Sequence, residues 1–280
     1  MEFSTLFQNP YALEIFKLLN GLLVVAIIFI PIERLFYIRK QHIFRKGFIQ
    51  DVGFYFVTWI TVTFILVVPI AMTIRFLGYF PLEPLHLWVG ALPLWIKVVM
   101  VLIVGDVAYY WVHRLMHTIP FLWHFHAIHH AAEEMDWLVN VRIHPVEIVL
   151  TRTGQFAPAF ALGLIGPHSP NSTGLVLIIP LVSAIWGYFI HANIRFRFGF
   201  IEALLASPAF HHWHHNNDGK EYINKNYAAL FPFLDRLFGS LYLPKRNPKI
   251  YGVPEQVPKD LAGRMIYPFQ KIWEKYILRR

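Results

Sequence analysis

The 280-residue sequence contains no cysteine. That absence excludes disulfides, iron–sulfur clusters and zinc sites built from thiolates. Charge is also scarce: Asp, Glu, Lys and Arg make up 15% of the residues, whereas soluble domains carry about a quarter. Hydrophobic residues reach 56%, and the mean hydropathy is +0.45. The composition therefore excludes an ordinary soluble domain and indicates a membrane protein.

Long apolar runs occupy much of the sequence. A transmembrane helix needs about 20 mostly apolar residues, and three runs meet that length, at 11–36, 52–77 and 94–112. Two weaker runs, at 146–165 and 175–190, are joined by a turn-rich segment and fit either two full spans or a hairpin. No basic segment precedes the first run and no small-residue cleavage site follows it. We therefore interpret it as an uncleaved membrane helix and not as a signal peptide.

Positive charge is distributed unevenly between the loops. Four basic residues lie at 39–46, whereas the segments 78–93 and 166–174 contain no Lys or Arg. Because basic loops stay in the cytoplasm, we expect the first loop, 113–145 and 192–280 to be cytoplasmic. The predicted fold is an all-α integral membrane bundle of about four to five membrane helices or hairpins, with a cytosolic, histidine-rich helical cap. The membrane would be a bacterial inner membrane or the endoplasmic reticulum.

The net charge of +8 comes mainly from the last third of the chain. Segment 192–280 has 14 Lys and Arg residues against 7 Asp and Glu. It is rich in aromatic residues and proline and has no basic stripe, so we interpret it as a water-facing surface beside an anionic leaflet. We expect no nucleic-acid partner. The sequence does not indicate an oligomeric state.

Histidine is concentrated in three clusters with regular spacing. The patterns are H-x3-H, H-x2-H-H and H-x2-H-H, formed by His113, His117, His126, His129, His130, His211, His214 and His215. Residues at i, i+3 and i+4 share one face of a helix, with Cβ atoms about 6 Å apart, so each cluster presents its imidazoles together. Pro120 and Ser207-Pro208 stand where the second and third helices would begin. His212 lies about 60° from His215 around such a helix and is an alternative ligand.

Eight imidazoles are more than one metal ion needs, because a structural zinc takes about four ligands and a catalytic zinc about three. The number suits two ions, but imidazole binds iron, zinc, copper and nickel alike. The H-x3-H spacing also occurs in zinc proteases, where the Glu of H-E-x-x-H is the general base. Arg114 occupies that position here, which disfavours a membrane zinc metallohydrolase. The other alternative, a histidine-lined metal transporter, would place its ligands near the middle of the spans.

The ordered motifs at 106–243 resemble the fatty acid hydroxylase superfamily, which includes sterol desaturases and C-4 methyl sterol oxidases. The resemblance covers about half of the chain, and in its last motif the family often has Thr where this chain has Ser240. It rests on Asp106-x2-Tyr109-Tyr110-Trp111-x-His113-Arg114-x2-His117, Leu122-Trp123-x2-His126-x2-His129-His130, Arg142-x-His144-Pro145-x-Glu147, Ser207-Pro208-x2-His211-x2-His214-His215, Asn226-Tyr227 and Asp235-Arg236-Leu237-Phe238-Gly239-Ser240.

The resemblance implies a non-haem di-iron centre that uses dioxygen to hydroxylate or desaturate a lipid, such as a sterol, a fatty acyl chain or an ether lipid. It adds His191 to the ligands, because the family has one more histidine between the second and third clusters. It divides the chain into a transmembrane region at 1–105, a di-iron catalytic domain with a second membrane hairpin at 106–243, and a cytosolic tail at 244–280. Nothing in the sequence resembles a haem or flavin site, so electrons are expected from an external redox carrier and reductase.

Two further residues are candidates for supporting the metals. Asp106 lies within the third apolar run, and an acid in a membrane helix is a functional candidate by default. We expect it to orient a histidine of another cluster through the free ring nitrogen; the alternative is an ion pair with an arginine such as Arg142. His144 is expected either to support the centre in the same way or to be structural. Asn226 and Asp235 are expected to support the cap.

Overall fold

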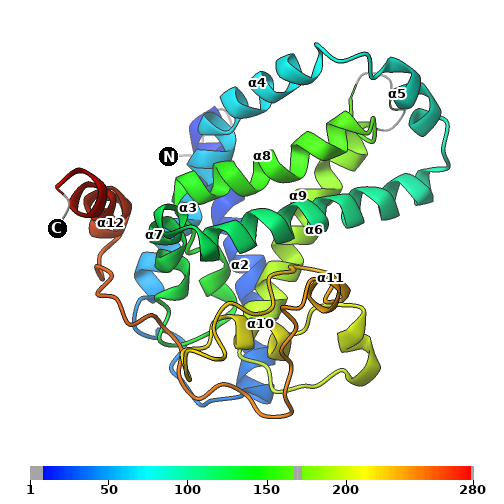
Figure 1. The fold of residues 1–280 in the computed structure, drawn as a ribbon. Helices are drawn as coiled ribbons and strands as arrows, with labels where there is room; N and C mark the ends of the chain where they lie inside the picture. The colour runs from blue at the N-terminus through cyan, green and yellow to red at the C-terminus, as the bar shows by residue number, and fades with distance from the viewer. Residues whose placement is uncertain (1–8, 167–168, 170–171, 279–280) are drawn as a thin grey trace.

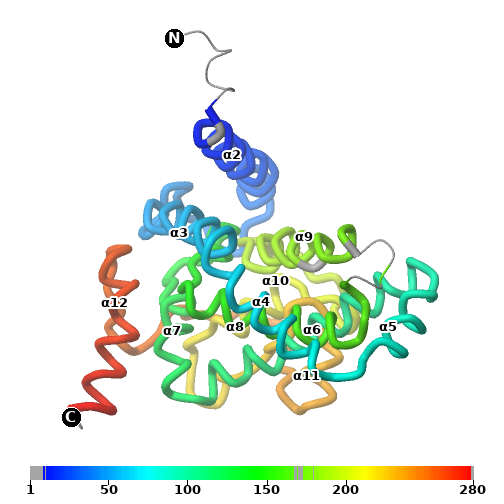
Figure 2. Tube along the Cα trace, turned by 90° about the horizontal axis from the view of Figure 1, so that it is seen from above, coloured from blue at the N-terminus to red at the C-terminus, as the bar shows by residue number. Residues whose placement is uncertain are grey.

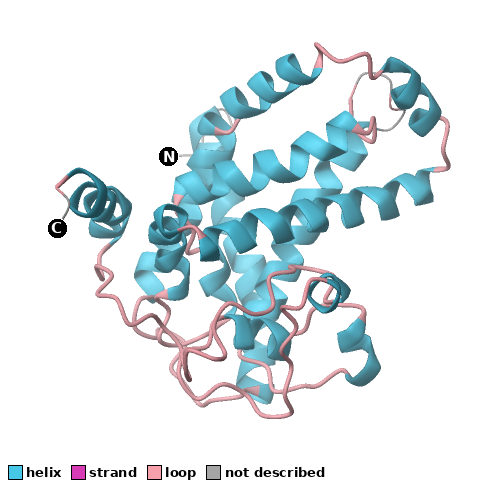
Figure 3. Ribbon diagram, in the orientation of Figure 1, coloured by secondary structure: helices cyan, strands magenta, loops and turns pink. Residues whose placement is uncertain are grey.

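The structure, a computed structural model, describes residues 9–166, 169 and 172–278. These residues form helices joined by loops, with no β-strand among them (Figures 1 and 3). The α-helices are α2 (Pro10–Phe36), α3 (Phe48–Ile60), α4 (Val67–Leu77), α5 (Glu83–Gly90), α6 (Leu94–Thr118), α7 (Pro120–His130), α8 (Pro145–Ala161), α9 (Ser172–His191), α10 (Pro208–His214), α11 (Phe233–Leu237) and α12 (Leu261–Ile272). Four short 3-10 or π segments are η1 (Thr61–Ile65), η2 (Trp137–Val141), η3 (Gly199–Ala203) and η4 (Trp273–Ile277). The expected all-α fold is confirmed.

Four helical segments are long and apolar enough to cross a membrane: Tyr11–Phe36, Phe48–Leu77, Leu94–Thr118 and Thr173–His191. They coincide with four of the five apolar runs, and the second is continuous through α3, η1 and α4. The remaining run, 146–165, forms most of α8, which has 17 residues and includes Glu147, Arg152 and Gln155. This helix is shorter and more polar than the other four. The chain is therefore a multi-pass membrane protein in which α8 is the exceptional helix.

Helix α6 holds the bundle together. α8 packs along α6 and against α4, whereas α9 packs against α6 and η2. α5 lies at the far end of the bundle, where the chain passes from α4 to α6 (Figure 1). α10, α11 and the long loops of the C-terminal third lie together at the opposite end, and α12 stands to one side next to α7 and α3 (Figures 1 and 2). The ends of α6, α8 and α9 that carry or approach histidines thus meet α7 and α10.

A buried ion network joins the first loop to α3 and η2. Arg45 Nη2 donates to Asp51 at 2.7 Å and to Asp136 at 2.5 Å. Arg142 Nε donates to the other oxygen of Asp51 at 2.6 Å. All four side chains are at most 5% exposed, so two arginines compensate two aspartates where water is excluded. The carbonyl of Arg142 also contacts the ring of His129, which connects the network to the second histidine cluster.

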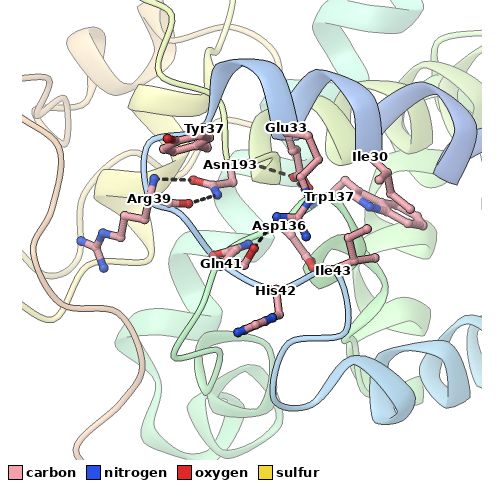
Figure 4. A pocket seen from close by; sticks show the side chains of 11 residues that line it. Ile30, Glu33, Tyr37, Arg39, Gln41, His42, Ile43, Asp136, Trp137 and Asn193 are labelled. Atoms are coloured by element: carbon pink, nitrogen blue, oxygen red, sulfur yellow. Dashed lines mark hydrogen bonds between the residues drawn. The ribbon is translucent and has the colours of Figure 1, made fainter.

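The C-terminal end of α2 is tied to the segment that follows α9 (Figure 4). Glu33 Oε1 accepts hydrogen bonds from the backbone N–H groups of Trp137 and Asn193, both at 2.8 Å. The Asn193 side chain accepts from the backbone N–H of Arg39 at 3.1 Å and donates to the Arg39 carbonyl at 2.7 Å. These bonds hold the chain two residues beyond His191 and so help to position that imidazole.

Candidate metal centre

Nine histidines converge where the ends of the helices meet. They form two groups, and within each group one ring nitrogen per residue lies within 4.8 Å of all the others. The five-histidine group contains His113, His117, His126, His130 and His214, and the four-histidine group contains His129, His191, His211 and His215. These are the same nine residues that the clusters and the family resemblance single out. All of them except the half-buried His117 are buried.

Helix geometry accounts for this convergence. α6 supplies two rings from its last turns, α7 supplies three, α9 ends at His191, and α10 with the residue after it supplies the third cluster. As predicted, α7 begins at Pro120, and Ser207 caps α10 by accepting a hydrogen bond from a backbone N–H at 3.3 Å. The second cluster is divided between the groups, because His126 and His130 face one group and His129 faces the other.

Backbone carbonyls determine which nitrogen carries hydrogen in four of the rings. The four Nδ1 contacts are His113 to Tyr227 O at 2.7 Å, His129 to Arg142 O at 3.2 Å, His191 to Gly187 O at 2.7 Å, and His214 to Lys225 O at 2.8 Å. A carbonyl oxygen only accepts, so each neutral ring keeps its one proton on Nδ1. The Nε2 atom then presents a bare lone pair to its group.

The contact between His129 and His191 shows what these tautomers imply. Their Nε2 atoms lie 3.2 Å apart, and both rings already use their proton at Nδ1. Two lone pairs at this distance repel each other unless a cation accepts both. In the five-histidine group, the Nε2 of His113, a ring that also has its proton at Nδ1, lies 3.0 Å from the Nε2 of His126. The donor set therefore fits a bound metal cation in each group.

The spacing of the nitrogens agrees with metal coordination. Bonds between imidazole nitrogen and zinc are about 2.0–2.1 Å long, so two such ligands at a right angle lie about 3 Å apart. Within the two groups, neighbouring Nε2 atoms are separated by 2.9–3.2 Å. The buried Nε2 of His117 has no hydrogen-bond partner among the described residues. Imidazole alone does not choose between iron, zinc, copper and nickel.

Burial keeps the imidazoles of the second and third histidine clusters, which lie outside the candidate membrane spans, in their neutral form. It lowers the pKa of the imidazoles well below their usual range, because the charged form would lose its hydration and would face other imidazoles. This applies to His126, His129, His130, His211, His214 and His215. Neutral imidazole is the form that binds metals, so these rings are available as ligands at neutral pH.

Glu147 is a supporting residue to which the sequence analysis assigned no role. Its Oε1 lies 2.8 Å from His126 Nδ1, the side chain is 4% exposed, and Oε2 has no hydrogen-bond partner in the described chain. A carboxylate on the second nitrogen of a ligand orients the ring and raises its basicity. The only signal in the sequence was the place of Glu147 in the Arg-x-His-Pro-x-Glu motif. Glu147 and His126 lie on different helices, so helical spacing could not have indicated their contact.

The contacts of Asp106 differ from both expectations. Among the described residues, Asp106 forms no hydrogen bond or ion pair with a histidine or with Arg142; its carboxylate accepts hydrogen bonds from three successive backbone N–H groups. These belong to Ala229, Leu230 and Phe231, at 3.0, 3.1 and 2.7 Å. Asp106 therefore anchors the loop just after Tyr227, whose carbonyl holds His113. It acts on the centre through the backbone and not through a ring.

Two histidines near the centre belong to neither group. His144 is structural: its Nδ1 accepts from the Val146 N–H at 3.1 Å at the start of α8, and its Nε2 lies 3.2 Å from the Met265 carbonyl. The Nδ1 of His212 lies 2.8 Å from the Tyr251 hydroxyl, and its Nε2 contacts two carbonyls at the end of α9, at 3.2 and 3.1 Å. The supporting role for His144 and the alternative ligand His212 are thus not borne out by the contacts.

The loop at 224–228 supplies carbonyls to the five-histidine group. Asp235 accepts from the backbone N–H groups of Tyr227 and Ala228 at 2.7 and 2.9 Å. Asn226 Nδ2 donates to the Phe210 carbonyl at 2.8 Å, which ties the loop to α10. These contacts agree with the expected supporting role of Asn226 and Asp235. They fix the backbone on which two of the ligand rings depend.

A cavity of about 540 Å³ borders the five-histidine group. His117, His130 and His214 contribute to its wall, together with Trp123 and Asn224. The cavity lies between the start of α7 and the loops at 216–224 and 252–255. Small molecules therefore have a path to three of the imidazoles from the end of the molecule formed by α10 and the C-terminal loops, which we call the cap; the cavity is called the cap-side cavity below.

Comparison with known proteins places this geometry in context. The family model for the fatty acid hydroxylase family matches residues 98–240, just over half of the chain. The ornithine lipid hydroxylase OlsE of Rhizobium tropici is 29% identical over 195 residues, which cover 69% of this chain and 56% of the relative. The alkylglycerol monooxygenase of Danio rerio is 28% identical over 174 residues, covering 60% of this chain and 36% of the relative.

A third relative, the very-long-chain aldehyde decarbonylase GL1-8 of Oryza sativa subsp. indica, is 29% identical over 171 residues, covering 60% of this chain and 59% of the relative. The chain thus spans between about a third and three fifths of the length of these curated relatives. No solved structure matches it.

Replacing Glu147 tests its contact with His126. We expect Glu147→Ala to weaken metal binding in the five-histidine group by about 10- to 100-fold, because the ring loses its orienting acceptor. Glu147→Gln keeps an acceptor oxygen and should lose less. The measurement is metal titration of the purified protein in detergent, and the metal retained in the four-histidine group reports that the variant is folded. Equal affinities for the wild type and both variants would contradict the assigned role.

Proposed function

The chain belongs to the fatty acid hydroxylase family, and from that premise we propose that it is a membrane-bound, non-haem di-iron oxidoreductase that uses dioxygen to hydroxylate or desaturate a lipid. The catalytic domain would be 106–243, preceded by the transmembrane region 1–105 and followed by the tail 244–280. The nine histidines of the two groups would be the ligands, one iron to each group. The observation that supports this most is the pair of facing lone pairs on His129 and His191.

When bound, a pair of irons would pass electrons to dioxygen and supply the oxidant that removes hydrogen from a substrate carbon. Hydroxylation would consume one dioxygen, two electrons and two protons and yield an alcohol and one water. Desaturation would consume the same reagents and yield a double bond and two waters. The chain itself would hold the Nε2 lone pairs in place, orient His126 through Glu147, and keep bulk water away from the buried rings.

The electrons would come from an external small redox carrier and its reductase. The clusters and the C-terminal segment would face the cytoplasm, in a bacterial inner membrane or the endoplasmic reticulum, because the loop at 39–46 is basic and lies beside them. The cap-side cavity offers a path by which dioxygen would reach the centre. The excess of Lys and Arg in segment 192–280 would attract an acidic carrier.

The substrate would be a sterol, a fatty acyl chain or an ether lipid. The relatives are named for acting on ornithine lipid, alkylglycerol and very-long-chain aldehyde, which supports a lipid in general. The two alternatives fit less well. A transporter would place its ligands in the middle of the spans, whereas these rings lie at the ends of α6 and α9. A zinc hydrolase would need a base at Arg114, which contacts the Tyr110 hydroxyl at 2.8 Å instead.

Oxygenation of lipids by the purified protein tests the proposal. The iron-loaded protein in lipid nanodiscs is supplied with a reductant, ¹⁸O₂ and a panel of sterols, fatty acyl lipids and ether lipids. We expect oxygen consumption together with either one ¹⁸O atom in a lipid alcohol or a new double bond. No oxygen consumption over a broad panel, with two irons shown to be bound, would contradict the proposal.

A further inference from the structure

Arg152 of α8 has no acidic partner in the described part of the chain. Its Nη1 donates to Gln155 Oε1 at 3.3 Å, one turn further along the helix. Among the described residues it forms no ion pair, whereas Arg45 and Arg142 both pair with Asp51. The guanidinium is half-buried, so its charge is partly removed from water without compensation from the protein. Such a group favours an anionic ligand.

Arg152 lies on the part of α8 that packs against the last turns of α6, the helix that carries His113 and His117. α8 starts at the histidine end of the bundle and runs beside α6 away from it (Figure 1). Gly154 packs directly against Val112, the residue before His113, so that a Cβ at Gly154 would come within 2.8 Å of a Val112 methyl. Arg152 is therefore close to the level of His113. A charged side chain on a helix that packs between apolar helices is costly and points to function.

An apolar cavity follows Arg152 along the same face of α8. It measures about 460 Å³ and lies between α4, α8 and α9. Phe156 and Phe160 of α8 line it, with Val176 and Leu177 of α9. Because these two phenylalanines follow Arg152 at intervals of four residues, all three side chains share one helix face. Apolar walls of this kind suit a hydrocarbon chain.

We propose that a lipid carrying a carboxylate or a phosphate lies along this face, with its hydrocarbon in the apolar cavity and its acidic group on Arg152 and Gln155. A guanidinium offers two parallel N–H donors that match the oxygens of either anion. This inference rests on the proposed function and narrows its substrate class to acidic lipids. The carbon to be oxidised then lies closer to the polar end of the lipid than to its tail, because Arg152 is nearer than the apolar cavity to the start of α8, where Glu147 contacts His126.

Binding measurements test the site without requiring turnover. The full-length protein in phosphatidylcholine nanodiscs is titrated with a fluorescent fatty acid and a fluorescent phosphatidic acid, and with the matching fatty alcohol and diacylglycerol as neutral probes. We expect at least one acidic probe to bind about tenfold or more tightly than its neutral match. Arg152→Gln should abolish that preference, and Arg152→Lys should retain part of it. The better of the two acidic probes identifies the anion.

Two control variants sharpen the test. Arg75→Gln removes an exposed arginine at the end of α4 and should leave the preference unchanged. Ile223→Trp fills the cap-side cavity and should also leave it unchanged. Unaltered preference in Arg152→Gln, no preference in the wild type, or a loss caused by Ile223→Trp and not by Arg152→Gln would each overturn the inference. Metal content equal to that of the wild type shows that Arg152→Gln is folded.

The two proposals fail in different ways. If the acidic probes bind through Arg152 but no lipid is oxidised, the binding site stands and the di-iron oxygenase does not. If lipids are oxidised but Arg152→Gln oxidises acidic and neutral lipids as the wild type does, the oxygenase stands and the acidic-lipid site does not. If both proposals hold, mass spectrometry of the product should locate the new oxygen or double bond near its polar end.

Discussion

Replacing His129 by alanine is expected to abolish lipid oxidation and to lower the bound metal from about two ions to about one per chain. His129 belongs to the four-histidine group, and its Nε2 lies 3.2 Å from that of His191. Removing the ring takes away one of the four imidazoles of that group, so the ion should bind too weakly to remain through purification. A catalytic metal supplies several kcal/mol of transition-state stabilisation, so kcat should fall by at least about 1,000-fold.

His212→Ala is the matched control for this variant. His212 is another buried imidazole, in α10, but its nitrogens contact the Tyr251 hydroxyl and two carbonyls and it belongs to neither group. We expect it to keep both metals, even where it loses some stability. Metal content is measured by inductively coupled plasma mass spectrometry and activity by product analysis. Full metal content in His129→Ala, or loss of metal in His212→Ala alone, would contradict the assignment of ligands.

Asp51→Ala should cause the largest loss of stability. It leaves the guanidinium groups of Arg45 and Arg142 in contact with one fewer carboxylate, at side-chain exposures of 1% and 2%. Removing one partner of a buried ion pair costs about 3–5 kcal/mol, because the remaining charge is uncompensated. For a chain of this size we expect the midpoint of thermal unfolding in detergent to fall by about 10 °C.

Glu133→Ala provides the comparison, because the Lys46–Glu133 pair joins the same two segments at the surface. Its side chains are 61% and 65% exposed, and an exposed pair contributes about 0–1 kcal/mol. The midpoint of thermal unfolding of Glu133→Ala should therefore stay within about 2 °C of that of the wild type. If Asp51→Ala unfolded at the same temperature as Glu133→Ala, the buried network would not be holding the first loop to η2.

The parts of the fold that follow from local sequence could be predicted. Apolar length located three of the four candidate spans and left the fourth, Thr173–His191, open between a full span and a hairpin. The i, i+3, i+4 spacing placed the cluster histidines on shared helix faces. Helix periodicity did not show that α7 divides its rings between two groups, because that depends on where α9 and α10 lie. His191 was found from the family resemblance alone, since a single histidine at the end of a span has no spacing to support it.

A supporting role was predicted for Asn226 and Asp235, but the contacts of Asp106 and Glu147 could not be predicted, because their partners are distant in the chain. Asp106 accepts hydrogen bonds from backbone N–H groups more than 120 residues away. Every residue except proline has such a group, so no residue type in the sequence indicates these partners. Glu147 reaches His126 only because α8 packs along α6 beside α7. Glu147, Arg152 and Gln155 interrupt the apolar run of α8: Glu147 contacts His126 of α7, whereas Arg152 and Gln155 contact each other along the helix.

Metal analysis of the wild-type protein decides whether the nine histidines hold two irons. The protein is expressed in iron-replete medium and purified without oxygen and without chelators. Mass spectrometry for all transition metals and Mössbauer spectroscopy of an ⁵⁷Fe-grown sample are then performed on the same preparation. We expect two irons per chain in nitrogen-rich coordination. A chain that holds no transition metal, or a single ion shared by all nine histidines, would contradict this expectation.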